Sequence, residues 1–249
     1  RREIHQTITS LFTMKNASYQ IITAHRKMAD VLTEHSKLIS IFPRLGIALG
    51  FGEKTVAQVC ADNGVTLPMF LIVGNVYTMD EYLPTDDELQ QCPIGDFVRY
   101  LIDSHKDYLD YKFPHIEQHL AEVVNDWNEK YKKLITNFFY DYKKEVVDHF
   151  KYEEEVVFPF VQALVHRTST KKNAPKKGAF DKQHTNIEDK LRDFTNLLIK
   201  YIPADVAQRE RIDMLEDICA LSEDIEKHAL IEEKILFPYI KILHEDENL

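Results

Sequence analysis

The chain has 249 residues, of which 44% are hydrophobic and 29% are charged, a balance typical of a globular protein with a sizeable core. Its net charge of −10 argues against a general affinity for nucleic acid or anionic membranes. No apolar run approaches the roughly 18 residues that span a bilayer, and the three cysteines form no Cys-x-x-Cys pair. We therefore expect a cytoplasmic protein without a membrane partner, which reaches nucleic acid only through a domain outside this chain.

Short helical patterns make up the first part of the chain. After sixteen residues that are typical of a tail or of an element needing a partner, helical patterns run through MADVLTEHSKLISIFPRLGI, TVAQVCADNG and LPMFLIVGNVY, with a turn at GFGEK. The stretch YLPTDDELQQCP is polar, acidic and bracketed by Pro84 and Pro93, so it is the best candidate for a linker. We predict a small helical N-terminal domain over residues 1–88.

Four long helical patterns follow, over residues from about 93 onward, roughly 127–164, about 180–201, and after the segment IPAD. Each has a buried stripe with a period of 3.6 residues. The stripes contain, in chain order, Ile94, Phe97, Val98, Leu101, Ile102, His105 and Tyr108; Phe138, Tyr142, Glu145, His149, Glu153 and Val156; His184, Ile187, Leu191, Phe194 and Leu198; Leu221, Ile225, His228, Glu232 and Ile235. They predict an all-α fold, with an up-down four-helix bundle over residues 94–249.

One phrase occurs twice in this bundle, as HFKYEEEVVFPFVQAL from His149 and HALIEEKILFPYIKIL from His228. In both copies a glutamate follows the histidine by four residues, so the two side chains share one face of a helix. These faces are the apolar stripes, where an uncompensated carboxylate is very costly and coordination to a cation satisfies it. The repeat predicts a metal site, and the second glutamates, Glu154 and Glu233, are expected to point elsewhere.

His105 and His184 add one histidine in phase with each of the two other stripes. The interval from His105 to His149 equals that from His184 to His228, so an antiparallel bundle holds them at comparable heights. Four histidines and two glutamates are enough for two metal ions, and nitrogen donors with bridging carboxylates suit iron. The predicted ligands are His105, His149, Glu153, His184, His228 and Glu232.

Several neighbouring residues have alternative interpretations. His115 and His119 form an His-x-x-x-His pair without a repeat partner, which favours a partly exposed face. Glu188 could supply a third carboxylate, although a position behind the ligands or at the surface is favoured. Tyr108 and Tyr152 are candidates for the pocket around the ions, with core packing as the simpler alternative. The Phe-Pro pairs of the two phrases are expected to pack and to bend the helix ends.

These residues resemble the hemerythrin-like (HHE) cation-binding domain, in which His-x-x-x-Glu-Glu-x-x-x-Phe-Pro occurs twice, and the resemblance covers roughly residues 94–243. It implies two non-haem iron ions, bridged by carboxylates and open to an additional oxo bridge, on the residues predicted above. Family members related to iron-centre repair often carry adjacent histidines in the first helix. This chain has a single one there, His105 in SHKDYLDYKFP, with Lys106 beside it.

The segment FPRLGIALGFGEKTVAQVCADNGV is similar to the small domain that precedes the bundle in the repair-of-iron-centres proteins. Those proteins usually carry Tyr-Cys-Cys-Gly-Gly at this turn, where the present chain has Leu-Gly-Phe-Gly-Glu over residues 49–53. A role that depends on vicinal cysteines is therefore not expected. Cys60, on the following helix, is expected to be a small buried hydrophobe.

The resemblance implies O2 or NO as a small ligand and leaves three functions open. The first is sensing of, or response to, oxidative and nitrosative stress. The second is donation of iron to damaged iron–sulfur proteins, and the third is catalysis as an NO reductase or peroxidase. The missing Cys-Cys pair favours the first over the second, and no separate substrate-binding motif supports the third. The oligomeric state is not predicted.

Overall fold

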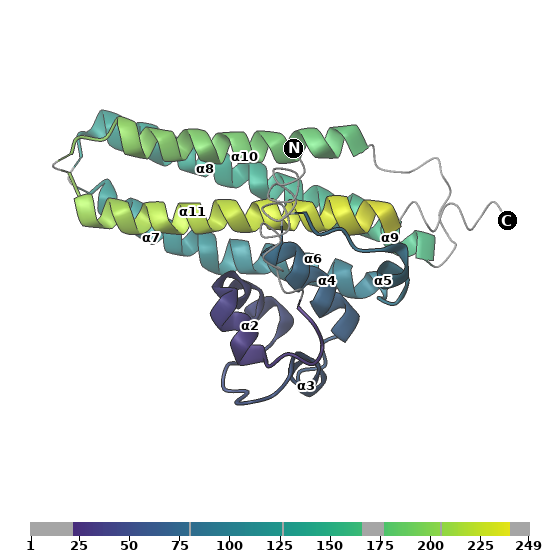
Figure 1. Cartoon of the computed structure of the whole chain (residues 1–249). Coiled ribbons are helices and arrows are strands. Elements are labelled where there is room, and N and C mark those ends of the chain that lie inside the picture. The colour runs from purple at the N-terminus through teal and green to yellow at the C-terminus, as the bar shows by residue number, and fades with distance from the viewer. Residues whose placement is uncertain (1–21, 80, 126, 166–176, 205, 240–249) are drawn as a thin grey trace, which may run out of the picture.

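The computed structural model describes residues 22–79, 81–125, 127–165, 177–204 and 206–239. All regular elements in these residues are helical, and the one extended pairing is an isolated bridge between Lys27 and Thr55. Four long helices lie side by side as an elongated bundle, and the shorter N-terminal helices pack against its side (Figure 1). The predicted all-α fold, a helical bundle preceded by a helical N-terminal part, is confirmed.

Three of the four bundle helices consist of two α-helical parts joined by a π-helical turn. The first helix comprises α6 (Ile94–Asp107), the π turn η3 (Tyr108–Lys112) and α7 (Phe113–Val123). The second comprises α8 (Glu129–Tyr152), η4 (Glu153–Val157) and α9 (Phe158–Val165). The third is α10 (Lys177–Lys200). The fourth comprises α11 (Gln208–Ile231) and η6 (Glu232–Leu236), and it stays helical to residue 239.

Each π turn ends at a Phe-Pro pair. The backbone N–H of Phe113, Phe158 and Phe237 donates to the carbonyl five residues earlier. The proline that follows has no N–H, and in a regular α-helix its ring would clash with the carbonyl four residues earlier. The wider π turn provides the room that the ring needs. The prediction that the Phe-Pro pairs of the two phrases pack is confirmed, since Phe158 lies in the core and Phe237 packs against it. Their predicted place at helix ends was wrong for Phe158, because the helix continues through α9.

The π turn η4 also changes which residues of the second helix are buried. Val156, predicted on the buried stripe, is 41% exposed, whereas Val157 is fully buried. The π turn inserts one extra residue, which rotates the following side chains by about 100°. Glu145 lies at the rim, where it pairs with Lys190. The other predicted stripe residues are buried, apart from Ile102 and Phe138, which are partly exposed.

The N-terminal part consists of short helices and 3₁₀ turns. They are α2 (Met28–Glu34), η1 (Ser36–Ile41), η2 (Pro43–Leu45), α3 (Val56–Asp62), α4 (Leu67–Thr78) and α5 (Asp86–Gln90). Capping boxes at Thr55 and Thr85 start α3 and α5. Gly50 and Gly52 adopt positive φ values, and both lie in the predicted turn GFGEK.

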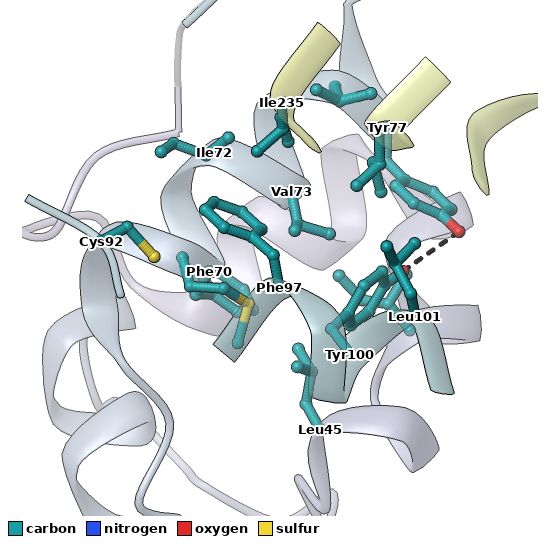
Figure 2. Close-up of a cluster of buried hydrophobic side chains, with 14 of the residues drawn as sticks. Leu45, Phe70, Ile72, Val73, Tyr77, Cys92, Phe97, Tyr100, Leu101 and Ile235 are labelled. Carbon is teal, nitrogen blue, oxygen red and sulfur yellow. Dashed lines mark hydrogen bonds between the residues drawn. The ribbon is translucent and has the colours of Figure 1, made fainter. Parts of the chain in front are cut away.

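One hydrophobic core joins the N-terminal part to the bundle. Phe70 and Val73 of α4 pack with Phe97 of α6 and with Ile235 of the fourth helix (Figure 2). The predicted linker contains α5 and contributes the buried Leu89 to the same core. A second core fills the other half of the bundle. The boundary between residues 88 and 94 stays a prediction.

Two of the three cysteines are buried. Cys60 is buried in the core, as predicted, and burial raises the pKa of its thiol to about 12. Cys92 is also buried, and Cys219 is exposed. Among the described residues, no helix combines the length and the apolar character that crossing a lipid bilayer requires.

Candidate metal centre

The six predicted ligands converge in the middle of the bundle, and none of them is more than 7% exposed. Every bundle helix contributes at least one. His105 lies on α6 and His184 on α10. His149 and Glu153 lie on α8 and η4, and His228 and Glu232 lie on α11 and η6. The antiparallel arrangement brings four sequence-distant segments to one level, as the equal spacing of the histidines predicted.

The six residues form two overlapping groups of closely spaced donor atoms. One group is His105, His228, Glu153 and Glu232; the other is His149, His184 and Glu153. Within each group the donor atoms all lie within 4.8 Å of one another. Glu153 belongs to both groups, which is the arrangement that two adjacent ions with a shared carboxylate require.

The two carboxylates each face both groups. Glu153 places Oε2 3.2 Å from Nε2 of His105 and Oε1 2.9 Å from Nε2 of His149. Glu232 places Oε2 3.1 Å from Nε2 of His184 and Oε1 3.5 Å from Nε2 of His228. One oxygen of each carboxylate therefore points to each side, as in a carboxylate that bridges two ions.

The donor set fits a cation better than it fits internal hydrogen bonding. All four carboxylate oxygens of Glu153 and Glu232 are buried, and none has a hydrogen-bond partner of acceptable geometry despite the nearby imidazoles. Orphaned buried carboxylates are costly. Atoms that each bond one ion at about 2.0–2.2 Å lie about 3 Å apart without pointing at one another. The contacts of 2.9–3.6 Å match this spacing.

Without an ion, the cluster holds protons that a cation would replace. Burial raises the pKa of Glu153, but three neighbouring histidines outweigh it and hold this pKa well below its usual range. Burial and the charge of Glu153 raise the pKa of Glu232 to about 7. The pKa of His184, lowered by burial but raised more strongly by both carboxylates, is about 10. Burial, reinforced by His105, keeps the pKa of His228 well below its usual range.

Glu154 does not point away from the centre, so that prediction was wrong. Its Oε1 lies 2.8 Å from Nδ1 of His105 on the neighbouring helix, although its side chain is 42% exposed. The ring of Phe150 stacks on the ring of His105; the two rings are parallel within 8°, and their centroids are 3.9 Å apart. A carboxylate on Nδ1 fixes both the tautomer and the ring orientation, with Nε2 directed at the cluster.

A buried arginine from the N-terminal part lies directly behind the cluster. The side chain of Arg44, in η2, is fully buried. Its guanidinium donates to Asp107 Oδ2 at 2.9 Å, to Asp224 Oδ1 at 3.0 Å and to the hydroxyl of Tyr77 at 2.9 Å. Asp107 follows His105 by two residues, and Asp224 precedes His228 by four.

Tyr108 connects this arginine to the candidate ligands. Its ring lies 4.7 Å from the guanidinium carbon of Arg44 and packs edge-on against His228, with centroids 5.7 Å apart. Its hydroxyl donates to the carbonyl of Asp224 at 3.1 Å. Tyr108 thus lies against the cluster, as one alternative proposed, whereas Tyr152 packs against the hydrophobic core. Sequence reasoning missed both Arg44 and Asp224. Arg44 lies in a short 3₁₀ turn next to a proline, where no pattern marks it as functional. Asp224 precedes His228 by four residues on the buried side of α11, and this position was a signal that could have identified it.

A small cavity opens beside the histidines. Its volume is about 10 Å³, and its lining includes His149, His184, His228 and Phe150. This is roughly the space that one water-sized molecule needs. Glu188 lies on the wall of the cavity and is outside both donor groups. Burial and the charge of Glu226 raise its pKa.

A comparison with known families agrees with this geometry. The model of the hemerythrin HHE cation-binding domain matches residues 97–240, which is more than half of the chain and includes all six converging residues. No curated protein matches the chain. The buried histidine and glutamate groups are what a cation-binding domain of this kind requires. The chain therefore belongs to the hemerythrin HHE family of metal-binding helical proteins.

Proposed function

We propose that this chain is a non-haem di-iron protein that binds O2 or NO and acts in sensing or response to oxidative or nitrosative stress. The observation that carries the proposal is the cavity of about 10 Å³ against three histidines of the centre. Only a ligand about as large as one water molecule fits such a space. A neutral diatomic satisfies this limit, whereas an organic substrate does not.

The proposed ion ligands are the six converging residues, namely His105, His149, Glu153, His184, His228 and Glu232. Imidazole nitrogens with carboxylate oxygens are a donor set that suits iron, and no thiolate lies among them. When bound, a ferrous pair supplies a coordination position at which a diatomic can bind. His105 and His228 face one position and His149 and His184 the other, with Glu153 and Glu232 between them.

The protein's own residues keep this centre dry and ordered. The parallel ring of Phe150 and the edge-on ring of Tyr108 pack against the histidines and limit the access of water. Glu154 holds His105 by its Nδ1 atom, so the ring cannot turn away. Burial lowers the pKa of His228 and keeps the imidazole neutral, which is the form that binds a metal ion.

The position of Arg44 supports sensing over simple storage. This one side chain of the N-terminal part contacts Asp107 and Asp224, which lie next to ligands on two bundle helices. A change in the separation of these helices would alter the contacts of Arg44. A ligand shifts the N-terminal part only when it binds two arrangements of the bundle with different affinity. We place the protein in the cytoplasm, where its free cysteines stay reduced.

The decisive experiment combines metal analysis with ligand binding. Anaerobically iron-loaded protein should contain two iron ions per chain and should change its absorption reversibly when NO or O2 is added. Hydrogen exchange should then change in residues 40–50 and 74–79, around Arg44 and Tyr77. Less than one iron per chain would contradict the di-iron centre. The alternative outcome is that a chelator or an apo iron–sulfur protein removes the iron within minutes while hydrogen exchange stays the same. That result would favour iron donation over sensing.

A further inference from the structure

A second group of metal-binding side chains lies on the outside of the bundle, away from the candidate iron centre. It consists of His115 and His119 on α7 and Asp217 on α11, with one donor atom of each within 4.8 Å of the others. His115 lies ten residues beyond His105 along the same helix, which corresponds to about 15 Å. The two groups therefore share no residue and cannot share an ion.

The geometry of this group is that of converging ligands. Oδ2 of Asp217 lies 3.0 Å from Nδ1 of His115 and 3.4 Å from Nε2 of His119. The two imidazoles stand edge to face, with centroids 4.9 Å apart and an angle of 80°. Oδ2 is buried and has no hydrogen-bond partner of acceptable geometry, although both rings are close. One carboxylate oxygen thus faces two imidazoles without a hydrogen bond to either.

Histidines four residues apart on one helix are an established way to present two nitrogens to one ion. Here a carboxylate from the adjacent helix adds a third donor. The backbones of both helices are held in place, because Ile116 and Leu120 of α7 pack into the same core as Ile218 of α11. The donors therefore stand on a fixed platform, and little conformational entropy remains to be lost when an ion binds.

Two further side chains lie close to the histidines. Oε2 of Glu122 lies 3.7 Å from Nδ1 of His119, which is too far for a hydrogen bond, and Nδ1 is buried without a hydrogen-bond partner. The ring of Tyr111 lies parallel to His115 within 5°, with centroids 6.2 Å apart.

We propose that His115, His119 and Asp217 form a second, surface site for a divalent transition-metal ion such as Zn²⁺. Two imidazoles and one carboxylate are a donor set that Zn²⁺ accepts, with its fourth position left to water or to an external ligand. The side chain of His115 is 48% exposed and that of Asp217 is 29% exposed, so the ion enters directly from solvent. This site is independent of the function proposed for the buried centre.

The test uses iron-loaded protein, so that the buried centre is occupied before zinc is added. Isothermal titration with Zn²⁺, followed by metal analysis after desalting, should give one zinc ion per chain with the iron content unchanged. His119→Ala removes one of the three donors and Asp217→Asn replaces a charged carboxylate with a neutral amide, so each should weaken zinc binding about tenfold or more. Glu122→Ala should cause a smaller loss, because Glu122 lies near His119 without a hydrogen bond to it. His25→Ala changes an exposed histidine elsewhere and should leave the affinity unchanged.

Three results would overturn the proposal. The first is the absence of zinc beyond the iron centre, and the second is zinc binding by His119→Ala and Asp217→Asn with wild-type affinity. The third is zinc uptake that displaces an equal amount of iron, which would place the ion in the buried centre. Circular dichroism on each variant checks its fold. Glu232→Ala keeps the three surface residues, so its zinc uptake measures the surface site a second time.

Discussion

The carboxylate of Glu154 lies 2.8 Å from Nδ1 of His105, although the two residues stand on different helices and the Glu154 side chain is 42% exposed. This contact joins the first bundle helix to the second at the level of the candidate ligands. The residue at the equivalent position in the second copy of the repeated phrase is Glu233. Glu154 is therefore expected to act on the metal centre through His105 rather than as a ligand.

Glu154→Ala should lower the affinity for the ion bound by His105 about 10- to 100-fold, because His105 loses the partner that fixes its tautomer and orientation. Iron titration of the anaerobic apoprotein, with absorption as the readout, measures this loss. Glu154→Gln should recover part of the affinity, since an amide oxygen can still accept from Nδ1. Glu233→Ala, the equivalent change in the second phrase, is the matched control. Equal losses in Glu154→Ala and Glu233→Ala would contradict the assigned role.

Glu153→Ala and Glu232→Ala should each abolish the paired site, because each carboxylate faces both groups of histidines. Iron content per chain should fall from two ions to one or none, while Glu233→Ala keeps both. Iron analysis of purified variants under anaerobic conditions provides the measurement. Two bound ions in the Glu153→Ala protein would mean that this residue is not the shared ligand.

Arg44→Met should destabilise the protein by about 3 kcal/mol, since it removes the buried partner of Asp224 and leaves only the ion pair with Lys112 at 3.3 Å. Denaturant unfolding of the apoprotein measures this change. Replacing both residues, as Arg44→Met with Asp224→Leu, should restore much of the stability, because the uncompensated charge is then gone. Lys27→Ala, which removes an exposed pair with Glu53, should leave the unfolding midpoint unchanged. A midpoint for Arg44→Met equal to that of the wild type would contradict the buried network.

Metal binding should release protons in a way that depends on pH. In the metal-free protein the pKa of His184 is about 10 and that of Glu232 is about 7. Below each pKa the ion must displace that proton, so the apparent affinity should fall as the pH falls. We expect about a tenfold loss per pH unit between pH 7 and 10, and about a hundredfold loss per unit below pH 7. Titrations in two buffers of different ionisation enthalpy count the protons, and an affinity independent of pH would refute the prediction.

The π turns show where buried positions can no longer be predicted from a period of 3.6 residues. In the second helix, Tyr142, His149 and Glu153 are buried as the stripe predicted, whereas Val156, inside the π turn η4, is exposed. A stripe with a period of 3.6 residues assumes an unbroken α-helix, and the extra residue of η4 breaks that assumption. The Phe-Pro pair at its end was the available signal, because a proline inside a helix requires some local adjustment.

The sequence by itself determined the four long helices and the six residues that meet at their centre. Both follow from local properties, namely the helical period and the spacing of a histidine and a glutamate within one phrase. Only the tertiary structure decided that Glu154 reaches His105, that Arg44 lies behind the cluster, and that Asp217 completes the pair on α7. These contacts join segments that are far apart in the chain. They depend on how the helices rotate and pack against one another, and this rotation cannot be predicted from the pattern within a single helix.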